Sequence, residues 1–160
     1  MPHSEDRLVG LISDTHGLVR PAVHQALQGV ELILHAGDVG GPAILDELRL
    51  IAPVRAVFGN TDPPGDRDLT ERIDLEIGGV HLHVSHGHEL GSPTPAKLAE
   101  HYDADVVIYG HTHHQLVTRL DQRLFVNPGA AGPRRFNLPP SVTRLTITNG
   151  KPEVEIIGIA

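Results

Sequence analysis

Side chains of the kinds that bind divalent metals follow apolar stretches of the sequence at five places. Each stretch has the composition of a β-strand and runs directly into aspartate, asparagine or histidine. The seven candidate donors are Asp14, His16, Asp38, Asn60, His86, His111 and His113. Carboxylate, carboxamide and imidazole groups suit borderline-hard ions such as Mn²⁺, Fe²⁺ and Zn²⁺. The pattern predicts a metal site where several strands end.

Two of the donors, His111 and His113, are spaced i and i+2 after the apolar run 106–108. Side chains alternate faces in an extended segment, so both imidazoles are expected to point into one site. Gly110 is expected to let the backbone pass close to a bound ion. Taken alone, the pair is equally compatible with a surface loop, because a lone His-x-His motif is weak.

The other donors also have ordinary structural interpretations. Asp14 suits a helix N-cap, Asn60 suits a turn, and His86 could simply end its strand. His81 and His83 alternate with apolar residues, so they are expected on the solvent side of a strand. Ordinary interpretations at five successive strand ends are improbable together, which favours the metal site. Four further histidines without such spacing are expected at the surface: His3, His24, His101 and His114.

The first 60 residues alternate strand and helix patterns. Strands are expected at 8–13, 32–34 and 54–58, and helices at 22–28, with Pro21 at the N1 position, and from Pro42 onward. This β-α-β-α-β order with short connections predicts parallel strands joined by right-handed crossovers. In such sheets ligands bind beyond the carboxyl ends of the strands, which is where the first four donors lie.

The remainder is expected to consist mainly of hairpins. After a Pro/Gly/Asp-rich loop at 62–68, the expected strands are 72–77 with 80–85 turning at Gly78-Gly79, 115–120 with 123–126, and 141–148 with 153–159 turning at Asn149-Gly150. A helix is expected to start at Thr94. Without a linker or internal repeat, the chain is expected to form a single domain over 1–160.

Composition excludes several classes of protein. With 160 residues, 39% of them hydrophobic, the chain fits a globular domain, and without cysteine it has neither disulfides nor thiolate sites. A net charge of −7 without a Lys/Arg stripe argues against non-specific nucleic-acid binding. The N-terminus lacks the features of a signal peptide, and no run approaches the ~18 apolar residues of a membrane span. We expect a soluble, cytoplasmic protein with no membrane partner.

The seven donors are too many for one tetrahedral ion. Two ions ~3.5–4 Å apart, bridged by a carboxylate and a water, form the site with which phosphatases clamp an in-line displacement. A bridging hydroxide is the nucleophile at neutral pH, because the ions lower the pKa of bound water. We therefore predict two divalent ions per chain, with Mn²⁺ favoured and Fe, Zn or Ni as alternatives.

The sequence resembles the calcineurin-like metallophosphoesterases, whose motifs are DxH, GD, GN, a lone H and GHxH. Within this family, the chain is most similar to the small YfcE-like phosphodiesterase branch. Four features carry this resemblance: the short length, the form 59–62 (GNTD), the histidine pair at 86–88 (HGH) and the segment 127–129 (NPG). The resemblance implies an α/β fold, a four-layer α/β/β/α sandwich of two mixed sheets flanked by helices. It also implies that Asp14, His16 and His113 hold one metal, that Asn60, His86 and His111 hold the other, and that Asp38 bridges them. The expected catalytic residues are Asp38, Asn60 and His86.

Two positions depart from the family pattern. Many relatives have a histidine after the GN pair that is thought to help protonate the leaving group. Here that residue is Thr61, so Asp62 and His88 are the nearest substitutes as proton donors. Ala130 stands where a serine is common in the branch.

The resemblance implies a divalent-metal-dependent phosphodiesterase that acts on a small phosphate ester. One alternative is a catalytically weak metal-binding scaffold for protein–protein interaction, like the related retromer subunit. Another is a metal-dependent hydrolase of a non-phosphate ester. Three arginines near the site loops are candidates for substrate contact, namely Arg20, Arg134 and Arg135. A homo-oligomer is an open alternative to a monomer.

Overall fold

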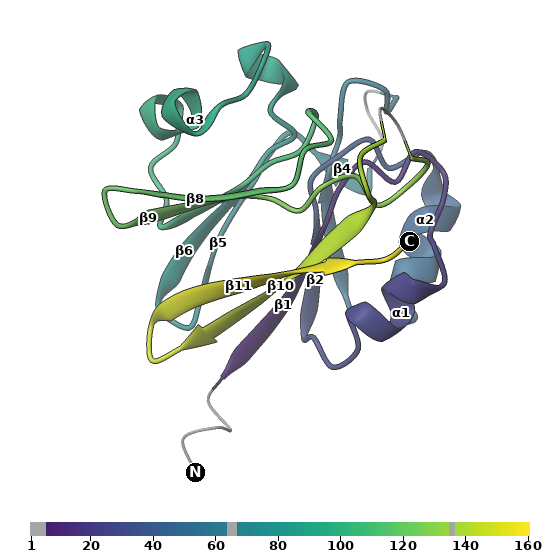
Figure 1. Ribbon diagram of the computed structural model, residues 1–160, viewed down its shortest axis with the longest axis horizontal. Coiled ribbons are helices and arrows are strands. Elements are labelled where there is room, and N and C mark those ends of the chain that lie inside the picture. The colour runs from purple at the N-terminus through teal and green to yellow at the C-terminus, as the bar shows by residue number, and fades with distance from the viewer. Residues whose placement is uncertain (1–5, 64–66, 135–136) are drawn as a thin grey trace.

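Two mixed β-sheets pack face to face in the computed structural model, which describes residues 6–63, 67–134 and 137–160 (Figure 1). The first sheet has the strand order β11-β10-β1-β2-β3-β4. Its strands are β1 (Arg7–Ile12), β2 (Leu32–His35), β3 (Val54–Val57), β4 (Leu69–Thr70), β10 (Ser141–Thr148) and β11 (Lys151–Gly158). Strands β1 to β4 are parallel, whereas β10 is antiparallel to β1. The predicted parallel arrangement of the first three strands is therefore confirmed.

The second sheet has the order β5-β6-β7-β9-β8. Its strands are β5 (Ile73–Ile77), β6 (Val80–Val84), β7 (Val106–Ile108), β8 (Leu116–Leu120) and β9 (Arg123–Asn127). Strands β6, β7 and β9 are parallel, and the hairpin partners β5 and β8 are antiparallel to their neighbours. The carboxyl ends of β6 and β7 thus lie at one edge of this sheet.

Helices cover the outer faces of both sheets, which gives the expected four-layer α/β/β/α sandwich (Figure 1). Helices α1 (Ala22–Ala26) and α2 (Pro42–Leu48) pack on the first sheet, and α3 (Pro95–His101) packs on the second. Strand β1 is apolar on both sides because Val9 and Leu11 face the core between the sheets, whereas Ile12 faces the helices. Each face of the strand is buried against a different layer.

Several local predictions are confirmed. The turns at Gly78-Gly79 and Asn149-Gly150 have positive φ at all four residues, as tight hairpin turns require. Thr94 is the N-cap of α3, and its side chain accepts a hydrogen bond from the backbone N–H of Lys97. Strand β4 and a 3₁₀ helix, η2 (His88–Leu90), were outside the predicted elements.

Two local predictions are wrong. Pro21 is the N-cap of α1, not its N1 residue, and the helix ends at Ala26. His83 is only 1% exposed, because α3 covers this face of the second sheet and the ring of Tyr102 stacks on the imidazole at 3.9 Å. His101 and His114 are exposed and His24 is half-exposed, whereas His3 lies outside the described residues.

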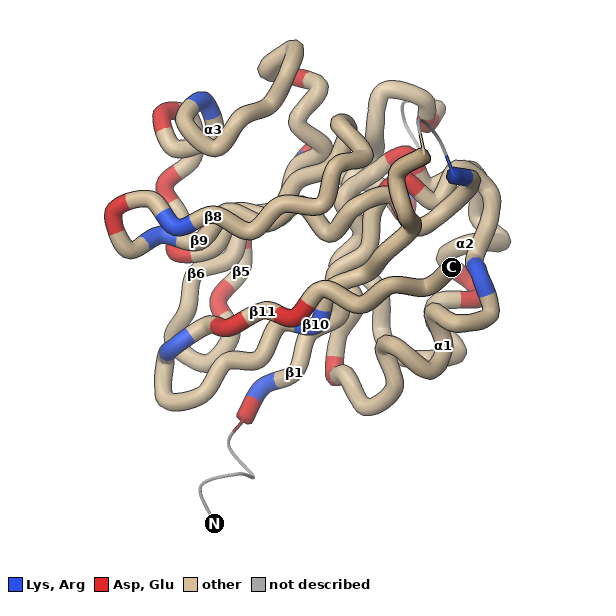
Figure 2. Tube along the Cα trace, viewed as in Figure 1, with Lys and Arg blue, Asp and Glu red and all other residues tan. Residues whose placement is uncertain are grey.

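Charged residues are spread over the molecule. Lys and Arg lie on separate elements, among them β1, α3 and β9, and form no stripe along any described element (Figure 2). None of the described helices is long and apolar enough to cross a membrane.

Candidate metal centre

The seven predicted donors lie together where strand ends of the two sheets meet. Asp14 and His16 follow β1, Asp38 follows β2, and Asn60 follows β3. From the second sheet, His86 follows β6, and His111 and His113 follow β7. Because the sheets pack face to face, these ends converge, and the contacts below connect all seven side chains.

Asp14, His16 and His113 form a first cluster whose donor atoms lie within 4.8 Å of one another. The Asp14 Oδ1 atom is 3.4 Å from His113 Nε2 and 3.7 Å from His16 Nε2. The two ring nitrogens are themselves 3.4 Å apart. Asp14 Oδ1 is buried and has no hydrogen-bond partner within the described part of the chain. A divalent cation would supply the missing partner of this buried carboxylate oxygen, which faces two imidazoles.

Asn60, His86 and His111 form a second cluster. The Asn60 Oδ1 atom lies 3.1 Å from His86 Nε2 and 3.1 Å from His111 Nδ1. On its other side, His86 Nδ1 lies 2.8 Å from the carbonyl oxygen of Ala36. A carbonyl only accepts, so Nδ1 carries a proton and His86 Nε2 is the atom available to a metal.

Asp38 lies between the two clusters. Its Oδ2 atom is 3.2 Å from His86 Nε2 in the second cluster and 3.7 Å from His16 Nε2 in the first. Its Oδ1 atom instead accepts hydrogen bonds from the backbone N–H and hydroxyl of Thr61. One oxygen is thus held by the protein, and the other faces both clusters, as a bridging ligand would.

The electrostatics of the site favour ionised carboxylates. Burial raises the pKa of Asp14, but the adjacent rings of His113 and His16 outweigh this and hold the pKa below its usual value. Burial likewise opposes ionisation of Asp38, whereas His86 and Thr61 lower its pKa to about 2. The pKa of His86 is raised despite burial, because Asp38 and Asp14 favour its protonated form. A metal ion at His86 would therefore have to displace a proton.

Five of the seven donors have left-handed backbone conformations. The φ values are 53° at Asp14, 45° at His16, 57° at Asp38, 72° at His111 and 65° at His113. Residues other than glycine rarely adopt this conformation, which costs about 1–3 kcal/mol each. The expectation that His111 and His113 lie in an extended segment is therefore wrong. Strand β7 ends at Ile108, and a tight turn places both imidazoles in the site.

Close backbone approaches require glycine beside the donors. A Cβ atom on Gly59 would lie 2.1 Å from Asp38 Oδ1. A Cβ atom on Gly110 would lie 2.1 Å from Ser13 Oγ and 2.7 Å from Asp14 Oδ2. Gly110 thus makes room for the carboxylate of a donor residue.

Asp62 has a role that the sequence did not reveal. Its carboxylate accepts hydrogen bonds from the backbone N–H groups of Val39, Gly40 and Gly59 at 2.9–3.2 Å. These contacts tie the loop that carries Asp38 to the loop that carries Asn60. Asp62 is therefore engaged in holding the two loops together, not directed at a substrate as a proton donor would be.

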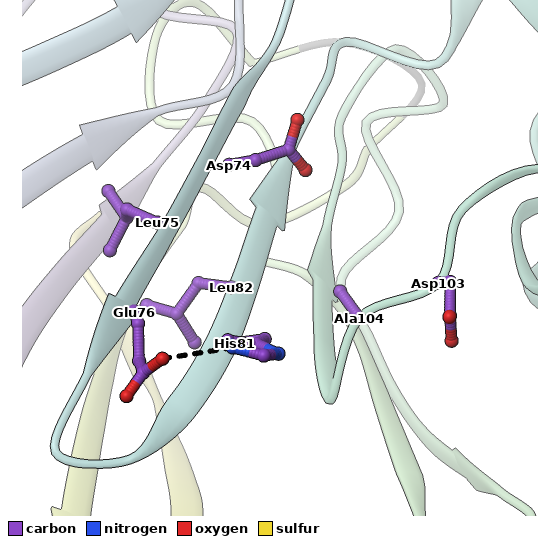
Figure 3. Close-up of a pocket in the computed structure, with 7 residues that line it drawn as sticks. All are labelled: Asp74, Leu75, Glu76, His81, Leu82, Asp103 and Ala104. Atoms are coloured by element: carbon purple, nitrogen blue, oxygen red, sulfur yellow. Dashed lines mark hydrogen bonds and ion pairs between the residues drawn. The ribbon is translucent and has the colours of Figure 1, made fainter.

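Ser85, His83 and Asp74 are arranged like the triad of a serine hydrolase. Ser85 Oγ is 3.0 Å from His83 Nε2, and His83 Nδ1 is 2.8 Å from Asp74 Oδ1. Ser85, however, is only 1% exposed. The adjacent cavity of about 370 Å³ is lined by Asp74, Leu75, Glu76, His81, Leu82, Asp103 and Ala104, and not by Ser85 (Figure 3). The buried Ser85 hydroxyl is therefore not presented to a substrate in this cavity.

The arginines near the site differ in availability. Arg20 Nε donates to the carbonyl oxygen of Gly132 at 3.2 Å, whereas the side chain of Arg134 is exposed. Arg135 lies outside the described residues. Ala130, at the position where a serine was considered, is buried and has no side-chain hydrogen-bonding group.

Comparison with known proteins gives consistent matches. Residues 8–150 match the calcineurin-like phosphoesterase superfamily domain. A probable metallophosphoesterase of Methanothermobacter thermautotrophicus is 37% identical over 158 residues, covering 94% of this chain and 91% of that protein. A phosphodiesterase of Methanocaldococcus jannaschii is 32% identical over 141 residues, covering 76% of this chain and 82% of that protein. The structure of vacuolar protein sorting 29 from Cryptosporidium parvum superposes with a TM-score of 0.80 at 22% identity, covering 95% and 97% of the two chains.

Proposed function

The chain belongs to the calcineurin-like phosphoesterase superfamily, and from that premise we propose that it is a phosphodiesterase dependent on two divalent metal ions. The proposal rests on one observation above all, the convergence of seven nitrogen and oxygen donors at the ends of five strands. The Methanocaldococcus relative, which is named a phosphodiesterase, supports a diester as the substrate class.

The donor set fits two divalent ions. Asp14, His16 and His113 would hold one, Asn60, His86 and His111 the other, and Asp38 would contact both. We favour Mn²⁺, because carboxylate, carboxamide and imidazole donors without thiolate suit a borderline-hard ion, with Fe, Zn and Ni as alternatives. When bound, such ions polarise phosphoryl oxygens and lower the pKa of a shared water so that a nucleophile is available at neutral pH.

The residues of the chain orient these groups. Thr61 holds Asp38 Oδ1, so Oδ2 stays directed at the clusters. The Ala36 carbonyl fixes the ring of His86, and Ser13 Oγ donates to Asp14 Oδ2 at 2.6 Å. Groups held in this way need little reorganisation as charge develops on the substrate.

A substrate would approach from the side of Asn60 and His111. Asn60 and Thr61 are exposed and His16 and His111 are partly exposed, whereas Asp14 and His86 are buried. The site is therefore open on one side, which suits a small phosphate ester. We propose Asp38, Asn60 and His86 as the residues on which activity depends most.

Two other functions remain as alternatives. A protein-interaction scaffold is compatible with the fold shared with vacuolar protein sorting 29. The complete donor set favours an enzyme over that alternative. A hydrolase of non-phosphate esters would use similar ions and ranks lower because of the family.

The test is a substrate screen with Mn²⁺ and with the metal chelator EDTA. Phosphodiesters, phosphomonoesters, cyclic nucleotides and a carboxylic ester would be offered to the same preparation. We expect hydrolysis of at least one phosphodiester with Mn²⁺ and none with EDTA. Metal binding without any hydrolysis would favour the scaffold, and hydrolysis of the carboxylic ester alone would favour the second alternative.

A further inference from the structure

His35 is a fully buried histidine at the end of β2, three residues before Asp38. Its Nδ1 atom accepts a hydrogen bond from the backbone N–H of Gly37 at 3.0 Å. Its Nε2 atom lies 2.9 Å from the hydroxyl oxygen of Thr15, which is also fully buried. The Thr15 hydroxyl lies 2.7 Å from the carbonyl oxygen of Val39.

Elementary donor and acceptor rules fix the direction of each hydrogen bond in this series, from Gly37 through His35 and Thr15 to Val39. The Gly37 N–H only donates, so Nδ1 of His35 carries no proton. The Val39 carbonyl only accepts, so the Thr15 hydroxyl donates its hydrogen bond to it. The Thr15 oxygen must then accept a hydrogen bond from Nε2–H of His35. The ring is therefore neutral, with its proton on Nε2, and all of its polar atoms are paired. Burial lowers the pKa of His35 to about 4, in keeping with a neutral ring.

This chain of bonds joins the two loops that carry Asp14, His16 and Asp38. Thr15 lies between Asp14 and His16, and Gly37 and Val39 flank Asp38. The same loops pair through backbone bonds at 2.9–3.0 Å, from Asp14 N to Gly37 O, from His16 N to Asp38 O and from Gly17 N to Val39 O. All three donor residues have the left-handed conformation described above. A strained loop keeps its shape only where its surroundings determine it, and His35 with Thr15 provides a fully buried side-chain contact between the loops.

We propose that His35 and Thr15 are positioning residues that hold the loops of Asp14, His16 and Asp38 in the conformation that binds metal. We call this pair the His35–Thr15 clasp. The inference rests on the proposed metal-dependent function, and it assigns no contact with metal or substrate to either residue. Partners behind metal ligands typically change metal affinity by 10- to 100-fold when they are removed.

The test uses four single variants and the Thr15→Val/His35→Asn double variant. Thr15→Val removes the hydroxyl with little change of shape, and Thr15→Ser keeps it. His35→Asn keeps an acceptor for Gly37 N–H but is too short to reach Thr15. Thr143→Val is the matched control, because Thr143 is a buried threonine of β10 whose hydroxyl has no hydrogen-bond partner among the described residues. Mn²⁺ affinity would be measured by calorimetry at a temperature where circular dichroism shows each variant folded.

We expect Thr15→Val and His35→Asn each to weaken Mn²⁺ binding by roughly 10- to 100-fold. The double variant should be little weaker than the worse single variant, because both changes break one link. Thr15→Ser and Thr143→Val should bind Mn²⁺ with an affinity close to that of wild type. For Thr15→Val and His35→Asn, steady-state activity should be closer to the wild-type activity at saturating Mn²⁺ than at limiting Mn²⁺.

Two outcomes would overturn the clasp. One is Mn²⁺ affinity in folded Thr15→Val and His35→Asn equal to wild type, even if their melting temperatures fall, since this would show a merely structural role. The other is an equal loss in Thr15→Ser. If the wild-type chain itself bound no divalent metal, the proposed function would fail instead, so the two failures are distinguishable.

Discussion

The Oδ1 atom of Asp38 accepts two hydrogen bonds from Thr61, one from the backbone N–H at 2.9 Å and one from the hydroxyl at 2.8 Å. Thr61 therefore occupies the position after the GN pair with a function of its own, which is to orient the carboxylate. The Oδ2 atom of Asp38 remains directed at His86 and His16.

Thr61→Val should lower kcat/KM by roughly 10- to 100-fold, because a hydrogen bond to a charged group contributes about 1.5–3 kcal/mol. The pKa of Asp38 should rise in this variant, which weakens metal binding at acidic pH. Thr61→Ser keeps the hydroxyl and serves as the control. Kinetics at several Mn²⁺ concentrations would check this, and equal losses in both variants would contradict the hydroxyl's role.

Asp38→Asn should abolish most activity and leave the fold largely intact. Loss of the charge that both clusters share weakens both metal sites, so we expect a decrease of at least about 100-fold. Asp46→Asn is the matched control, because the Asp46 side chain is 73% exposed on α2. Turnover near the wild-type level at saturating Mn²⁺ would show that Asp38 does not bridge.

The rate should depend strongly on the leaving group. A positioned general acid contributes roughly 10²–10⁴-fold, yet Thr61 and Asp62 are both engaged with other groups. His88 is the remaining candidate from the sequence, with its ring centroid 6.4 Å from that of His111. We expect a steep negative slope of log kcat/KM against leaving-group pKa, with aryl diesters much faster than alkyl diesters. A flat plot with chemistry rate-limiting would reveal a proton donor elsewhere.

Acid should destabilise the metal-free, EDTA-treated protein through protonation of His35 in the unfolded chain. Its pKa is lowered by burial to about 4, against 6.5 for an exposed ring, so the unfolded chain binds the proton more readily. The neutral His35 ring makes its full contribution to the free energy of unfolding above pH 6.5. As the pH falls toward 4, the unfolded chain takes up the proton first, and on the order of 3 kcal/mol of this contribution is lost for the fully buried group. Urea unfolding of wild type and His35→Asn at pH 7 and pH 4.5 measures it. The variant should lose less stability between the two pH values; an equal loss would assign the effect to other groups.

Motifs at strand ends made the convergence of the candidate donors predictable. The parallel β-α-β pattern places the donors of the first sheet at one sheet edge, and the motifs after β6 and β7 added those of the second sheet. The same reasoning could not give the backbone of His111 and His113, since an i, i+2 spacing suits both a strand and the tight turn that the structure has. The sequence predicted that His111 and His113 lie in one site, but the extended segment given as the reason was wrong.

The sequence did not predict the environment or role of residues whose partners come from distant elements. His83 alternates like an exposed strand residue, and only the packing of α3 and Tyr102 buries it. Asp62, Thr61 and His35 act across loops that follow different strands, and nothing in local spacing marks such pairs. The extent of the domain, a cytoplasmic location and a homo-oligomer stay predictions.

Metal stoichiometry tests the central claim most directly. Protein purified without chelator, stripped, reloaded with Mn²⁺ and freed of excess ion would be analysed for metal per chain. Seven nitrogen and oxygen donors in two clusters around Asp38 predict about two equivalents in wild type and a marked loss in Asp38→Asn. A wild-type plateau at one equivalent, or at none, would contradict the dinuclear site.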